Sequence, residues 1–166
     1  MFLRFVYTMF IGVLFATLVG VGIAAFYPEP ESPDYPRRLE ISKPVNEQTT
    51  AEYEKQEKMQ DEYDKAFEAY QDKQNVYSRN VSIVSLVIAI AILVVSLTLF
   101  KPLQLIADGL LFGGLLTLLY SIIRGFSTDD NMFRFIVVAI GFITAMIIGY
   151  IKFVKPAEAK QQKKKK

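Results

Sequence analysis

Asp108 is the residue whose position in the sequence is most suggestive of chemistry, because it is the only acid inside a long apolar stretch. A carboxylate at membrane depth is costly, and such residues often lie on ion or proton paths. Asp108 lies near one end of its stretch, where Lys101 or Lys152 would pair with it. A single acid makes a poor relay, so we expect a structural ion pair, with transport as the alternative.

The chain lacks residue types on which several classes of enzyme reaction depend. The chain of 166 residues contains no cysteine, no histidine and no tryptophan. It therefore has no thiolate nucleophile, and it lacks the commonest general base and transition-metal ligand. Phosphate-binding, dinucleotide-binding and nucleophile-elbow motifs are also missing. We expect no cofactor and no enzymatic activity. Catalysis inside the membrane ranks last, because no two acids converge there.

Hydrophobic residues make up 52% of the chain and are concentrated in four blocks. Each block is close to the ~20 residues that a helix needs to cross ~30 Å of hydrocarbon. A helix of a soluble protein keeps a polar face, and these blocks have none. The sequence therefore predicts an all-α membrane protein with four transmembrane helices, over residues 5–26, 81–100, 103–123 and 135–154.

The first block also resembles a signal peptide, because Gly22 and Ala24 loosely match a small-residue cleavage site. Its apolar run of about 22 residues is longer than the ~7–15 residues of a signal peptide's hydrophobic region. We therefore expect residues 1–26 to be an uncleaved transmembrane helix.

Charge is divided unevenly between the segments that join the spans. Residues 27–80 hold 13 acidic and 8 basic residues, whereas Arg4, Lys101, Lys152 and the tail 155–166 are mainly basic. Basic segments remain in the cytoplasm, so we predict a cell-membrane protein with both termini cytoplasmic. The polybasic tail would be attracted to anionic lipid. A net charge of only +2 implies no nucleic-acid partner.

The predicted extracytoplasmic segment has two parts. Residues 27–48 are rich in proline, and Pro30, Pro33 and Pro36 recur every three residues, which is typical of a stiff polyproline II spacer. Residues 49–80 begin with the capping box Thr49-x-x-Glu52 and are rich in helix-forming residues. No glycine or proline follows until Pro102, so this helix is predicted to continue into the second span without a break. Residues 81–154 contain the second, third and fourth spans.

Aromatic residues recur along one side of this helix at spacings of three and four, with glutamines between them. Tyrosine and glutamine fill a tight coiled coil poorly, yet an exposed aromatic row in water is disfavoured. Either the proline-rich segment folds back over the row, or a partner helix or second copy covers it. The aromatic row consists of Tyr53, Tyr63, Phe67, Tyr70 and Tyr77.

Small residues at a spacing of four allow close packing of membrane helices. The second span has Ser85 and Ala89 on one face, with Ser82 and Ser96 nearby. Separately, the tight connection at Pro102 predicts that the second and third spans form an antiparallel hairpin. We expect most rows to pack inside the bundle, although the first span's row would also suit a second copy or another protein. The rows are Thr8, Gly12, Ala16, Gly20 and Ala24 in the first span, Gly109 and Gly113 in the third, and Gly141, Ala145 and Gly149 in the fourth.

Residues 127–130 supply a cap and two acids at the start of the fourth span.

The four spans, the projecting helix and the lack of catalytic residues together predict a non-enzymatic membrane accessory or scaffold subunit. It would contact another membrane or envelope protein, or its own copies, through its transmembrane faces and the projecting helix. A small oligomeric transporter that uses Asp108 is the alternative. A cysteine-free exterior segment favours a bacterial envelope, because it needs no oxidative folding.

Overall fold

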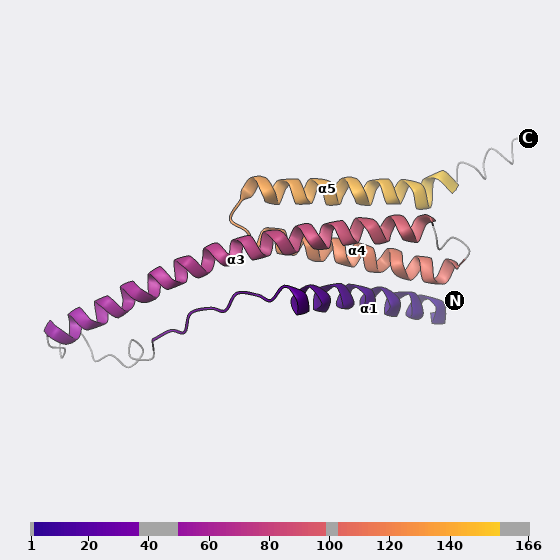
Figure 1. The fold of residues 1–166 in the computed structure, drawn as a ribbon. Helices are drawn as coiled ribbons and strands as arrows, with labels where there is room; N and C mark the ends of the chain where they lie inside the picture. Colours follow the sequence, from indigo (N-terminus) through magenta and orange to yellow (C-terminus); the bar gives the residue numbers. More distant parts are fainter. Residues whose placement is uncertain (1, 37–49, 99–102, 157–166) are drawn as a thin grey trace, which may run out of the picture. The chain divides into compact units, whose positions relative to one another are not determined.

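The computed structural model describes residues 2–36, 50–98 and 103–156, and this part of the chain contains helices and no strand. The prediction of an all-α protein is confirmed. Four helices are long and apolar enough to cross a membrane. In chain order the elements are α1 (Phe2–Phe26), α3 (Thr50–Thr98), α4 (Gln104–Phe126), α5 (Asn131–Gly149) and the π-helical η2 (Tyr150–Val154) (Figure 1).

The chain forms two compact units. The first consists of Met1–Pro28 with Ser78–Lys166 and is called the membrane unit here, because it holds the apolar parts of the four long helices. The second consists of Glu29–Tyr77. The 49-residue helix α3 contributes to both units. Its unbroken course confirms the prediction of one helix from residue 50 onward. The predicted cap residue Thr49, and Lys101 and Pro102 of the predicted hairpin, lie outside the described residues, as does the tail beyond Pro156.

Helices α3 and α4 are antiparallel, as the sequence predicts. Near one end of the pair, Ser96 Oγ donates a hydrogen bond of 2.6 Å to the Ala107 carbonyl oxygen. Near the other end, Ser82 Oγ donates one of 2.8 Å to the Ser121 carbonyl oxygen. The same number of residues separates the two contacts on each helix, in opposite chain directions, which defines the register of the hairpin.

The apolar core of the membrane unit is small and lies where α3, α4 and α5 meet. Ala89 and Leu93 of α3, Leu118 of α4 and Ile148 of α5 form its buried centre. Helix α1 packs against α4, so α4 contacts each of the other three apolar helices. Only 6% of the most apolar window of α1 is buried, as expected for a helix whose other faces meet lipid.

The turn between α4 and α5 satisfies main-chain groups at both helix ends. Thr128 Oγ1 donates a hydrogen bond of 2.8 Å to the Gly125 carbonyl oxygen at the end of α4. Asp130 is the N-cap of α5, and its carboxylate accepts from the main-chain N–H groups of Met132 and Phe133. The predicted cap at residues 127–130 is therefore present, with Asp130 as the capping residue.

Candidate functional site

Asp108 is held in an ion pair inside the membrane unit. Its Oδ1 lies 2.5 Å from Lys152 Nζ, and the Asp108 and Lys152 side chains are 41% and 29% exposed. Lys152 belongs to η2, the wider π-helical turn with which α5 ends. One of the two lysines expected to pair with Asp108 therefore does so. The pair has no net charge, which lowers the cost of placing either residue in a membrane.

Within the described residues, the recorded partner of the Asp108 carboxylate is Lys152 and not a second acid with which it could exchange a proton or share an ion. In the described ranges, no group of three or more carboxylate, histidine or cysteine side chains is arranged to hold a metal. A proton relay needs successive titratable groups, and here the carboxylate meets a lysine instead. The arrangement suits a structural pair between α4 and the end of α5.

Three of the predicted small residues, Gly12, Gly109 and Gly113, form a close contact between α1 and α4. A Cβ added to Gly12 would overlap the Phe112 ring and lie 3.0 Å from the Gly113 main-chain nitrogen. A Cβ on Gly109 would lie 2.8 Å from the Ile11 Cβ. Glycine is required at these positions because any side chain would separate the two backbones.

The other predicted small residues do not share one packing face. Gly141 meets α4, because an added Cβ would lie 3.0 Å from Ile122 Cδ1. Gly20 and Gly149 have no atom within 4 Å of an added Cβ. Thr8 and Ala16 are half-buried, whereas Ala24 and Ala145 are exposed.

The structure also contains two contact residues of α4 that the small-residue rows did not identify, Gly114 and Ser121. A Cβ on Gly114 would lie 2.7 Å from Leu93 Cγ, so α3 approaches α4 closely at that point. The hydroxyls of Ser82 and Ser121 are fully buried and each donates to the main chain of the other residue. The consecutive glycines at 113 and 114 were a usable signal, since they provide close approach on two neighbouring faces of one helix.

In the unit Glu29–Tyr77, the proline-rich segment packs along α3. The Tyr35 and Tyr63 rings meet edge to face with centroids 5.1 Å apart, and Gln74 Nε2 donates to Glu29 Oε1. Tyr63 in turn stacks on Phe67 at 5.9 Å. The first of the two expected coverings, by the chain's own proline-rich segment, is therefore present at Tyr63.

No family model, no curated protein and no solved structure matches the chain. Its function is therefore inferred from its own residues.

The rest of the aromatic row differs in accessibility. Tyr53 is 53% exposed and Phe67 is 37% exposed, whereas Tyr77 is only 3% exposed. Tyr70 is half-buried, with its ring 6.1 Å from that of Phe67. A surface for another protein on this helix would therefore use Tyr53 and Phe67, which remain accessible, and not Tyr77.

Proposed function

We propose that this protein is a non-enzymatic accessory subunit of the cell membrane. It binds a second protein through residues 50–80, the charged half of α3. The observation that carries the proposal is the single helix Thr50–Thr98, which joins a charged stretch to an apolar one without a break. A helix anchored in this way presents its side chains at a fixed register. Tyr53 and Phe67 are large aromatic residues that the chain leaves accessible, and buried aromatic anchors dominate protein interfaces.

The proposed orientation places the charged half of α3 outside the cytoplasm. At one end of the membrane unit, Arg4 of α1 lies beside the start of α4, and Lys152 and Lys155 lie near that same end of α4. These cations favour the cytoplasmic side. The α4–α5 turn lies at the opposite end and carries Asp129 and Asp130. The membrane helices then alternate in direction, which leaves residues 27–80 on the outer side.

Contacts within the membrane would add to this association. Most of α1 is uncovered, and the open space beside Gly20 allows the backbone of another helix to approach. Small residues at such positions are the usual means by which membrane helices associate. A transporter that uses Asp108 is the weaker proposal, because the carboxylate is already neutralised by Lys152.

The proposal is tested by the native mass of the protein, extracted from its own membrane in a mild detergent. We expect a complex that contains a second, different protein. The paired change Tyr53→Ala with Phe67→Ala should release that protein. The matched control changes Tyr150→Ala and Phe153→Ala, which replace two exposed aromatic residues at the end of α5, should leave it bound. A protein that is isolated as a single chain, or whose complex is unaffected by the paired change, would overturn the proposal.

A further inference from the structure

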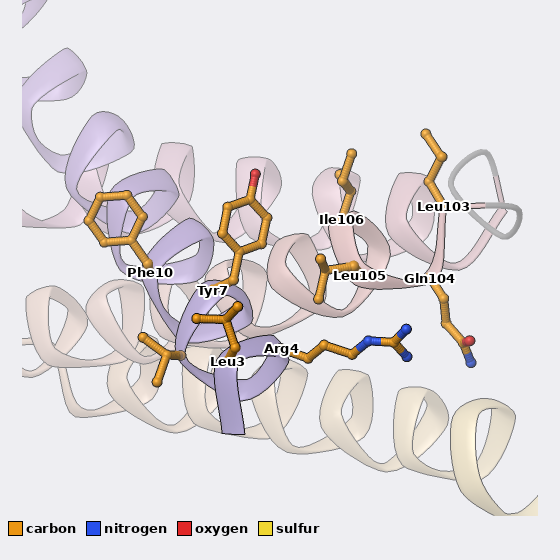
Figure 2. A pocket seen from close by; sticks show the side chains of 9 residues that line it. Leu3, Arg4, Tyr7, Phe10, Leu103, Gln104, Leu105 and Ile106 are labelled. Atoms are coloured by element: carbon orange, nitrogen blue, oxygen red, sulfur yellow. The ribbon is translucent and has the colours of Figure 1, made fainter. Parts of the chain in front are cut away.

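An apolar groove runs between α1 and α4 at the N-terminal ends of both helices. Its volume is about 730 Å³, and it is walled by Leu3, Val6 and Phe10 from α1 and by Leu105 and Ile106 from α4. Figure 2 shows these two helices on either side of it, with the Arg4 side chain extending toward the side of Gln104. The groove thus combines apolar walls with one cation and one amide.

The chemistry of the groove suits a lipid better than a helix. Its volume lies within the ~300–1,000 Å³ of pockets for small organic ligands. Hydrocarbon is the solvent around these helices, so an acyl chain fills an apolar groove without exposing polar groups. The guanidinium of Arg4 pairs with no carboxylate in the parts of the chain that the structure describes. Arginine binds phosphate oxygens through two parallel hydrogen bonds, which matches a phospholipid headgroup.

A second cavity adjoins the polar end of the groove. It has a volume of about 440 Å³ and is lined by Gln104, Lys152 and Lys155, together with apolar residues of α3 and α4. Gln104 lines both cavities. Lys152 is paired with Asp108, whereas Lys155 is exposed. Basic pockets between membrane helices are typical sites for anionic lipid headgroups.

We propose that the groove is a binding site for one anionic phospholipid. One acyl chain lies between α1 and α4, and the phosphate is held by Arg4 and Gln104, with Lys155 as a further cation beside it. This site is independent of the protein partner, and Lys155 is the one residue of the polybasic tail 155–166 that it uses. It goes beyond the general attraction of basic residues to a membrane surface, because it combines a defined apolar cavity with a cation at one end.

The test uses the full chain in lipid nanodiscs that contain a small fraction of a phospholipid with a photoreactive acyl chain. The headgroup is phosphatidylglycerol in one sample and zwitterionic phosphatidylcholine in the other. We expect labelled peptides from α1 and the start of α4, with about fivefold more label from phosphatidylglycerol, the effect of roughly one favourable charge near a membrane surface. Equal labelling by the two lipids would overturn the proposal.

Variants locate the headgroup preference on Arg4. Arg4→Gln should reduce labelling by phosphatidylglycerol to the level of phosphatidylcholine, and Arg4→Lys should retain part of the preference. Arg79→Gln, which removes an exposed cation from the other end of the membrane unit, is the matched control and should change nothing. Ile106→Trp should fill the groove and remove the label from α1 with both lipids.

Two further outcomes would count against the site. If the preference survives Arg4→Gln, the headgroup is recognised elsewhere. If soluble glycerol phosphate displaces the lipid at equal concentration, the cations bind free phosphate and the groove contributes nothing. Persistence of the label in the presence of glycerol phosphate supports a site for the whole lipid.

Discussion

Ser82 and Ser121 exchange two hydrogen bonds between α3 and α4, since each hydroxyl donates to the main-chain carbonyl oxygen of the other residue, at 2.8 and 2.7 Å. Both side chains are fully buried. Because lipid offers no hydrogen-bonding partner, a hydroxyl at such depth must find one inside the protein. The two serines therefore fix the register of the hairpin as well as contributing to its stability.

We predict that Ser82→Ala and Ser121→Ala each lower the free energy of unfolding by about 0.6 kcal/mol, the average for such bonds between membrane helices. The double variant should lose about twice as much, because each acceptor is a main-chain oxygen that the other substitution leaves in place. Unfolding in mixed micelles measures these values. Ser127→Ala, at an exposed position, is the control. A single substitution that costs as much as the double variant would show that the two bonds are not independent.

The close contact of α1 with α4 makes a second prediction. Gly12→Val should lower the thermal stability of the membrane unit, because the new side chain would overlap Phe112 and overpacking typically costs about 1–3 kcal/mol. Gly20→Val is the matched control on the same helix, since no atom lies near the added group. Equal melting temperatures for the two variants would contradict the observed packing of α1.

The ion pair between Asp108 and Lys152 leads to predictions about the stability of variants at these positions and about ion flux through the protein. Asp108→Asn and Lys152→Met should each destabilise the fold, because each leaves one polar partner without its counterpart. The double variant Asp108→Asn with Lys152→Met should be more stable than the two single losses together imply, by about 1 kcal/mol. Proton and cation flux into reconstituted vesicles should be the same for the original chain and Asp108→Asn. A flux that Asp108→Asn abolishes would favour the transporter.

The orientation in the membrane can be tested by labelling introduced cysteines, and the chain gives no background labelling because it contains no cysteine of its own. A single cysteine replacing Ser127, an exposed position in the α4–α5 turn, should react with a membrane-impermeant maleimide on intact cells. A cysteine replacing Lys155 should react only after lysis. Labelling of Lys155→Cys on intact cells, with protection of Ser127→Cys, would indicate the reverse orientation.

The helices were predictable because their physical causes are local. The stretch from residue 50 to 98 contains no glycine or proline, and the apolar blocks are long enough to cross a membrane. The cap at Asp130 also follows from neighbouring residues. These features need no knowledge of which helix faces meet, whereas the pairing of Asp108 with Lys152 depends on how α4 packs against the end of α5.

The helix contacts were less predictable, because a spacing of four places small residues on one face without identifying the partner. Gly12 meets α4, whereas Gly20 on the same face has open space beside it. The π-helical turn at Tyr150–Val154 has no sequence signal of its own. The contact of Tyr35 with Tyr63 depends on tertiary packing. The spacing of the aromatic row therefore did not distinguish whether the proline-rich segment or a partner covers these residues.

The most direct test of the proposed partner is a photo-crosslinking amino acid placed at position 53, activated in intact cells. A binding role predicts one discrete product of higher mass that contains a second, different protein, and the same residue at position 150 should not give that product. A Tyr53 variant that gives no product, or a product made only of this chain's own copies, would contradict the accessory role.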